Sequence, residues 1–321
     1  MDIPRAVLNR PNGTKLTPMH FSVIIPTCHR NDLLAKCLDC LAPGQQSGLQ
    51  IAEEKRNVET HVPKSGHGIL AEDIPNLWHY SYEVIVSDDG TQSTAEQMIR
   101  EIYPWARWAA GPRRGPAANR NNGAKHAKGE WLVFTDDDCL PQTGWLEAFA
   151  LHSEKYDLLE GRTSALGLPA RGDDECPFNE SGGYLWSCNF AIKREKFASL
   201  KGFDEAFPSP AMEDVELNTR VNKASLARLF VPTAQVLHPW RRRKGRDFAK
   251  AYAKSVAHYV KLHPEQAPKF ALRSVSITFL RTFKNRAVHA IKTGQFAGLT
   301  RQIYLDACSG FLSWREVARS S

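Results

Sequence analysis

The sequence predicts an α/β fold in which a parallel-type sheet is covered by helices on both faces. Three short apolar runs, at 21–25, 82–86 and 131–134, have the length and composition of buried strands. The accompanying stretches with helical apolar spacing cover 33–41, 94–102 and 117–128. Such an alternation builds sheets whose ligands bind beyond the carboxyl ends of the strands.

The segments around the first strand are polar. Residues 1–19 contain three prolines and are expected to form a flexible tail. The strand closes at Pro26, and Asn31 or Asp32 is expected to cap the helix that follows. Residues 43–78 are rich in Gly, Gln, Glu and Lys and exceed the length of an ordinary connection, so we expect an inserted loop there.

The second half of the chain continues the alternation less regularly. Residues 182–189 are expected to approach the sheet edge as a strand, and a helical run follows Met212 as far as Val221. Two further strands are expected at 227–231 and 234–237. Beyond them, aromatic and aliphatic residues recur at helical spacing among Lys and Arg, which predicts two or three amphipathic helices.

Charge is distributed unevenly along the 321 residues. Residues 241–301 contain 15 Lys or Arg against Asp247 and Glu265, a local charge of +13 in a chain whose total is +7. A segment of this kind suits an anionic membrane surface or a polyanion, or it forms solvated helix faces. Phe279 and Phe283 lie among these cations, so a peripheral membrane helix and a helix packed on the rest of the protein are both open.

The seven cysteines are scattered, and no N-terminal apolar segment resembles a signal peptide, which favours a reducing, cytoplasmic setting. No apolar run reaches the length needed to span a bilayer. Cys37 and Cys40 form one Cys-x-x-Cys in a helical run, without a second pair at zinc-site spacing.

An acidic triplet, Asp136-Asp137-Asp138, directly follows the third apolar run. Three carboxylates at one strand end are costly unless a cation shares them, and carboxylate oxygens suit Mg²⁺ or Mn²⁺. In an extended segment Asp136 and Asp138 point the same way. A solvated acidic loop is the alternative, and the neighbouring strand ends decide between the two because Asp88 and Asp89 are expected at the same edge.

Six motifs in this order resemble the family 2 glycosyltransferases, which have the GT-A fold. They are Ile25-Pro26-Thr27, the run 83–90, the run 118–123, Phe134 to Asp138, the run 202–205 and Glu213-Asp214. The resemblance covers about 21–240. It implies a GT-A catalytic domain at 20–245, with a nucleotide-sugar half at 20–138, an acceptor half at 139–245 and a basic helical C-terminal extension at 246–321.

The resemblance also implies roles for individual residues. The donor nucleotide sugar is expected to contact Thr27, His29, Arg30, Asp88, Asp89, Arg120, Asp136 and Asp137, with Arg120 facing the diphosphate. Asp137 is alternatively structural. The implied metal ligands for Mn²⁺ or Mg²⁺ are Asp138, Asp136 and His238, and Arg241 or Arg243 is a candidate phosphate contact.

Asp214 is the implied general base of an inverting displacement, and Glu213 and Trp186 are assigned to the acceptor or sugar. The structural alternative for Glu213 and Asp214 is that acidic side chains are electrostatically favoured near the N-terminus of a helix. The implied partners are a nucleotide-diphosphate sugar and a glycan or lipid-linked acceptor, with an anionic membrane surface at the inner face as a further candidate. We do not expect nucleic acid.

Two other functions are compatible with carboxylates on an α/β sheet. A sugar-phosphate nucleotidyltransferase uses a similar metal site, but it would usually carry a glycine- and lysine-bearing loop where this chain has Thr27 to Arg30. A catalytically silent scaffold that binds a membrane or polyanion would need neither the triplet nor Glu213-Asp214.

Overall fold

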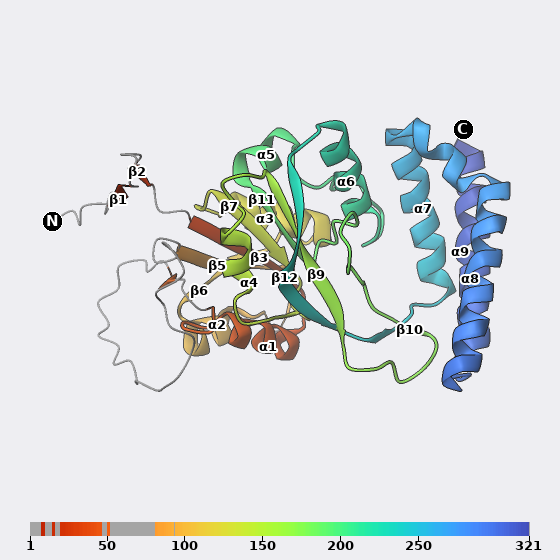
Figure 1. Ribbon diagram of the computed structural model, residues 1–321, viewed down its shortest axis with the longest axis horizontal. Coiled ribbons are helices and arrows are strands. Elements are labelled where there is room, and N and C mark those ends of the chain that lie inside the picture. Colours follow the sequence, from red (N-terminus) through yellow and green to blue (C-terminus); the bar gives the residue numbers. More distant parts are fainter. Residues whose placement is uncertain are drawn as a thin grey trace.

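The computed structural model describes residues 8–9, 15–16, 20–46, 50–51, 81–92 and 94–320. Within them, a nine-stranded mixed sheet has the order β4-β5-β3-β7-β11-β9-β12-β8, and β6 pairs with β5 (Figure 1). The strands of this sheet are β3 His20–Thr27, β4 Gln50–Ile51, β5 Ser81–Asp88, β6 Ala106–Ala110, β7 Trp131–Thr135, β8 Leu140–Pro141, β9 Leu158–Leu166, β11 Asn189–Lys193 and β12 Arg228–Pro239. Two small pairs stand apart, β1 Leu8–Asn9 with β2 Lys15–Leu16 and β10 Asp174–Glu175 with β13 Arg241–Arg242.

Helices cover both faces of the sheet, as predicted. They are α1 Asn31–Leu41, α2 Glu96–Ile102, α3 Pro116–Lys125, α4 Trp145–Ala150, α5 Arg194–Ser199, α6 Glu213–Lys223, α7 Arg246–Leu262, the 3₁₀ helix η2 Pro264–Phe270, α8 Leu272–Thr293 and α9 Leu299–Ser320. Residues of α1, α2 and α4 join one buried apolar cluster, and residues of α3, α5 and α6 join another on the opposite face. The sheet therefore has a core on each side.

Strand β3 shows why the sheet has two cores. Val23 and Ile25 belong to the cluster under α1, whereas Ile24 points to the cluster under α3. This alternation follows from the two-residue repeat of an extended chain. Helix α3 lies so close to β3 that a Cβ at Gly123 would come 2.5 Å from Ile24 Cγ2.

The carboxyl ends of the first three predicted strands meet at one edge. Strand β3 is parallel to both β5 and β7, and Thr27 lies opposite Asp88 in the register. The acidic triplet comes directly after Thr135, the last residue of β7. Residues more than a hundred positions apart are thus brought to one side of the sheet, as the strand pattern predicted.

Several local expectations were wrong. Asn31 does not cap α1; the capping position is Arg30, which makes no side-chain cap bond. The stretch from Gly182 to Cys188 is irregular, and β11 begins only at Asn189. The two strands expected at 227–231 and 234–237 are one strand, β12, with a register shift between Val231 and Gln235.

The expected tail at 1–19 and the expected inserted loop at 43–78 lie largely outside the described residues. The proposed boundaries at 138 and 245 stay predictions.

The C-terminal helices form a layer at one end of the molecule, with α7 nearest the sheet and α8 and α9 beyond it (Figure 1). Helix α7 packs on the start of α6 through a cluster that joins Met212 to Val256, Tyr259 and Val260. The prediction of amphipathic helices in this region is confirmed. Among the described helices, none combines the length and apolar character needed to cross a bilayer.

Candidate active site

A cleft of about 840 Å³ opens at the carboxyl edge of β3, β5 and β7 and is closed on its other side by α6 and α7. Besides the phosphate candidate Arg241, it brings together nine of the thirteen residues assigned from the sequence to the donor, the sugar, the cation or catalysis: Thr27, His29, Arg30, Asp89, Arg120, Asp136, Trp186, Glu213 and Asp214. The other four, Asp88, Asp137, Asp138 and His238, do not line the cleft. Their contacts explain why.

The carboxylate of Asp88 accepts hydrogen bonds from the turn that follows it and from strand β6. Its oxygens accept hydrogen bonds from the backbone N–H groups of Gly90 at 2.8 Å and Ala95 at 2.7 Å, and from Trp108 Nε1 at 3.2 Å. The side chain is buried. Asp88 therefore shapes the turn between β5 and α2, and no carboxylate oxygen is left to face the cleft.

Asp89 lies on the cleft side of the same turn. Its oxygens accept from the backbone N–H groups of Arg113 at 2.8 Å and Gly115 at 3.2 Å. Burial raises the pKa of Asp89, although these two hydrogen bonds oppose the rise. Next to it, His29 has a φ of 55° and its Nε2 approaches the backbone N–H of Thr91 at 3.4 Å. This rim presents polar groups to the cleft.

Asp137 connects the loops after β3 and β7. Thr27 Oγ1 donates to Asp137 Oδ2 at 2.7 Å, and Arg30 Nε donates to the same oxygen at 3.0 Å. Arg30 Nη2 forms an ion pair with the other oxygen, Oδ1. The side chain is fully buried, and burial raises the pKa of Asp137 to about 7. These contacts correspond to the structural alternative for this residue.

Arg120 bridges the two walls of the cleft. Its Nη2 donates to Asp136 Oδ1 at 2.7 Å, and its Nη1 donates to Glu213 Oε1 at 3.3 Å. Burial alone would raise the pKa of Asp136, but Arg120 holds it below its usual value. The Arg120 guanidinium already pairs with two carboxylates. Binding of a diphosphate in this cleft would therefore need other cations as well.

More open cations lie along the same cleft. Arg30, Arg113, Arg241 and Lys244 line it, and Lys244 Nζ lies 4.5 Å from the centre of the Phe248 ring. Lys244 was not among the site residues predicted from the sequence, although its place in the basic run after His238 was the available signal. Arg243 points elsewhere, to Asp306 and Glu175. Arg241 is the better placed of the two candidate phosphate contacts.

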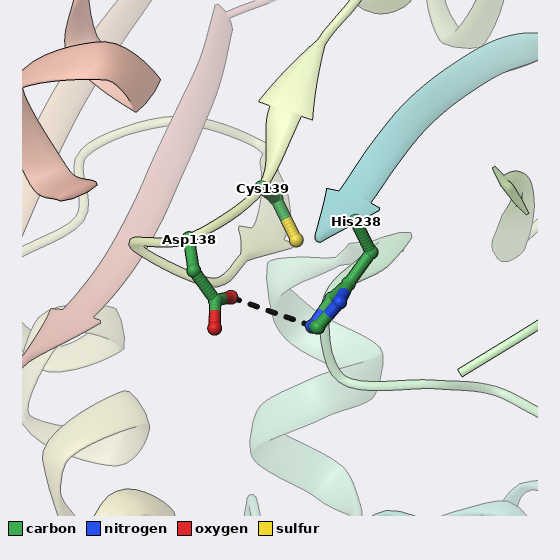
Figure 2. A group of neighbouring side chains, drawn as sticks. All are labelled: Asp138, Cys139 and His238. Carbon is green, nitrogen blue, oxygen red and sulfur yellow. Dashed lines mark ion pairs between the residues drawn. The ribbon is translucent and has the colours of Figure 1, made fainter. Parts of the chain in front are cut away.

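Asp138 and His238 face one another beside the cleft (Figure 2). His238 Nε2 lies 3.4 Å from Asp138 Oδ1, and within the described part of the chain neither atom has a hydrogen-bond partner although both are buried. His238 Nδ1 lies 2.8 Å from the carbonyl oxygen of Pro239. When Nδ1 donates to that carbonyl, Nε2 presents a lone pair to a carboxylate oxygen.

Two buried acceptors that face each other fit a bound cation. A divalent ion between Asp138 and His238 would satisfy both, and the Pro239 carbonyl would orient the imidazole as outer-shell partners commonly do. Asp136 is not part of this group, and its Oδ1 accepts a hydrogen bond from Arg120. The structure adds Cys139, whose Sγ and the ligand atoms of Asp138 and His238 all lie within 4.8 Å of one another.

Cys139 is not a strong ligand for a hard cation. A hydrogen bond with Cys188 and burial raise the pKa of the Cys139 thiol well above its usual value, so the sulfur stays protonated. Mg²⁺ and Mn²⁺ prefer oxygen and imidazole nitrogen over a neutral thiol. The group therefore fits a cation held by Asp138 and His238, with the thiol as a neighbour.

Asp214 lies in the first turn of α6 on the opposite wall. The preceding Met212 is buried with a φ of 78°, a strained conformation that the packing of α7 holds in place. Burial, together with the neighbouring Glu213, raises the pKa of Asp214 to about 7 against the opposing effect of Arg120. A carboxylate with a pKa near neutrality is suited to accept a proton from a hydroxyl.

An aromatic surface borders the same wall. Trp186 stacks on Tyr184 with ring centres 5.6 Å apart and planes inclined by 12°. Trp186 Nε1 donates to the carbonyl oxygen of Phe178 at 2.7 Å, which fixes the orientation of the indole. An indole face at the rim of a polar cleft suits an apolar face of a sugar ring.

Comparison with protein families gives a match to the model of glycosyl transferase family 2 over residues 57–159. Among curated proteins, a pre-mycofactocin glycosyltransferase of Mycobacterium tuberculosis is 28% identical over 174 residues, which are 48% of this chain and 36% of that protein. A poly(ribitol-phosphate) beta-glucosyltransferase of Bacillus spizizenii is 27% identical over 165 residues, 51% of this chain and 22% of that protein. The chain thus spans about a third or less of the length of these relatives.

Solved structures share the fold at low identity. A mannosyltransferase from Pyrobaculum calidifontis, in complex with GDP-Man and Mn²⁺, aligns with a TM-score of 0.54 and 18% identity over 97% of this chain and 90% of that one. A structure of GalNAc-T7 with UDP, GalNAc and Mn²⁺ aligns with a TM-score of 0.50 and 14% identity over 77% of this chain and 51% of that one. At these identities the likeness establishes the fold.

Proposed function

We propose that the chain, which matches the model of glycosyl transferase family 2 over residues 57–159 and has the GT-A fold, is a member of that family. It would transfer a sugar from a nucleotide-diphosphate donor to an acceptor hydroxyl, with inversion at the anomeric carbon. The observation that carries the proposal is the buried pair of Asp138 and His238, whose facing acceptor atoms suit a cation beside a cleft of donor size.

The donor would lie along the carboxyl edge of the sheet. Asp89 and His29 offer polar contacts to a nucleoside, while Arg241, Lys244 and Arg30 offer positive charge to the diphosphate. A divalent cation supplies further positive charge to the diphosphate when it is bound, and Asp138 and His238 are the residues that would hold it. Arg241 Nη1 lies 3.8 Å from Asp138 Oδ2, so the cationic side chains and the cation ligands lie close together.

Asp214 would act from the opposite wall. An acceptor hydroxyl becomes an effective nucleophile when a base takes its proton as the new bond forms. The raised pKa of Asp214 gives it the proton affinity for that step, and Glu213, held by Arg120, sits beside it to orient the sugar. Attack from this side, opposite to the departing diphosphate, inverts the anomeric configuration.

The acceptor proposed is a glycan or lipid-linked saccharide, with Trp186 stacking on one of its rings. The two curated relatives are named a pre-mycofactocin glycosyltransferase and a poly(ribitol-phosphate) beta-glucosyltransferase, and for this chain we propose a hydroxyl-bearing saccharide as the acceptor. We further propose a reducing, cytoplasmic setting, which seven free cysteines support.

The test is nucleoside diphosphate release from a panel of uridine, guanosine and thymidine diphosphate sugars, with Mn²⁺, with Mg²⁺ and with EDTA. We expect release from at least one donor, loss of release in EDTA, and loss in Asp138→Ala but not in the matched surface variant Glu96→Ala. Release that persists undiminished in Asp138→Ala would disprove the metal assignment. Formation of pyrophosphate from a sugar phosphate and a nucleoside triphosphate would instead establish the nucleotidyltransferase alternative.

A further inference from the structure

Helix α8 exposes a mixed apolar and basic face that has no partner within the described protein. Of its 22 residues only Ala290 is buried, because α8 packs mainly on α9 at the outer end of the molecule (Figure 1). One exposed stripe recurs at helical spacing and consists of Arg273, Ile277, Leu280, Lys284, Val288 and Ile291. Leu280 is 63% exposed and Ile291 is 72% exposed.

The charge on this helix has one sign. Helix α8 contains five Lys or Arg and no Asp or Glu. Arg286 is neutralised by Asp306 on α9, at 2.7 Å. Within the described chain, Arg273, Arg281, Lys284 and Lys292 have no carboxylate partner. Aliphatic side chains therefore alternate with unpaired cations on the same exposed surface, which is the composition of helices that lie in a lipid interface.

The end of α8 is tied to the loop that leads into β10, whose Glu175 lines the cleft. Gln295 Nε2 donates to the carbonyl oxygen of Pro169 at 2.9 Å, and Gly172 N–H donates to the carbonyl oxygen of Ala297 at 2.8 Å. The neighbouring Leu168 is 92% exposed. One residue earlier, the carbonyl oxygen of Gly167 accepts from Trp240 Nε1 at 3.0 Å, and Trp240 directly precedes Arg241 of the cleft.

We propose that the exposed stripe of α8 docks on a membrane surface that carries anionic lipid, and that the acceptor is accordingly lipid-linked. The second part rests on the proposed transferase function. The first part does not. Ile277, Leu280, Val288 and Ile291 would enter the headgroup boundary while the cations contact lipid phosphates.

A second copy of the chain fits this face poorly. In a two-fold dimer the same surface meets itself, so Arg273, Arg281 and Lys284 would face a helix that carries cations and no acid to pair with them. Anionic headgroups supply the missing negative charge. Charge complementarity therefore favours lipid over self-association.

The test is flotation of the full chain with vesicles of phosphatidylcholine alone and of phosphatidylcholine with phosphatidylglycerol, at low and high salt. We expect binding to the phosphatidylglycerol vesicles that weakens at high salt. Leu280→Glu with Ile291→Glu is expected to lower vesicle partitioning by at least about tenfold, since two apolar contacts are lost and two anions are added.

The matched control is Ile102→Glu with Leu151→Glu, which changes two equally exposed apolar residues away from α8. It is expected to leave flotation unchanged. Absence of binding to phosphatidylglycerol vesicles at low salt, equal binding of the α8 variant, or a dimer in light scattering that the α8 variant dissolves would each overturn the proposal. Nucleoside diphosphate release from the donor panel in solution measures the transferase activity independently of membrane binding. The α8 variant should retain this activity.

Discussion

Replacing Arg120 with methionine tests the bridge between the two walls of the cleft. The substitution keeps a long apolar side chain but removes the cation that Asp136 and Glu213 share at 2.7 Å and 3.3 Å. Their side chains are 18% and 7% exposed, so water compensates little for the loss. Breaking a buried pair by removing one partner costs about 3–5 kcal/mol, and the residual exposure of Asp136 favours the lower end, about 3 kcal/mol.

The pH dependence of this loss has a definite sign. In the native protein the pKa of Asp136 is lowered, so its contribution to stability is present above the unfolded value of about 4 and is lost as the pH falls through the folded pKa. Without Arg120, burial and mutual repulsion raise the pKa of both carboxyls, and protonation relieves them in mild acid. The destabilisation of Arg120→Met should therefore shrink as the pH is lowered from about 8 to about 5.

Urea unfolding in EDTA at these two pH values measures the effect without a bound cation. Arg100→Met is the matched control, because Arg100 is 71% exposed in a surface pair with Glu96 and should cost less than about 1 kcal/mol. Adding Glu213→Gln to Arg120→Met should recover part of the stability. A loss below about 1 kcal/mol for Arg120→Met at pH 8, or a loss that grows toward acid, would refute the reasoning.

Three further substitutions test the site and the packing beneath it. The transfer rate should fall as the pH drops through about 7, because Asp214 becomes protonated there. The Asp214→Asn variant should be about 10²–10⁴-fold slower and should lack this pH dependence. Unchanged turnover of the variant would exclude Asp214 as the base. His238→Ala should weaken Mn²⁺ binding in calorimetry at least about tenfold, and unaltered affinity would exclude it as a ligand. Gly123→Ala should cost about 1–3 kcal/mol in urea unfolding because its Cβ would lie 2.5 Å from Ile24 Cγ2, whereas Gly245→Ala, with no atom within 4 Å, should be nearly neutral.

Much of the donor side of the cleft could be predicted from short segments. Strands β3, β5 and β7 are recognisable in the sequence as apolar runs, and polar residues directly after parallel strands lie at one edge of the sheet. Thr27, Asp89 and Asp136 reached the cleft for that reason alone. The strands of the second half were harder, since β9 and β12 mix polar and apolar residues and β12 passes through a register shift without ending.

The individual roles depended on contacts that no spacing reveals. Asp88 and Asp89 are adjacent and chemically identical, yet Asp88 accepts hydrogen bonds from Gly90, Ala95 and Trp108 of β6, while Asp89 lines the cleft. Likewise, Cys139 belongs to the candidate cation group only because His238, near the end of β12, lies beside it. Trp108 and His238 come from other strands, and no local sequence pattern reveals either contact.

The sequence by itself determined which edge of the sheet carries the carboxylates and that the C-terminal segment is basic and amphipathic, because strand period, helix period and charge are local properties. Only the tertiary structure decided that Arg120 pairs with both Asp136 and Glu213. It also decided that, among the described residues, Asp138 Oδ1 and His238 Nε2 face each other without a hydrogen-bond partner and that the apolar stripe of α8 stays exposed. Hydrogen bonds, pKa values and exposure depend on which distant groups the packing brings within a few ångströms, and that information exists only once the chain has folded.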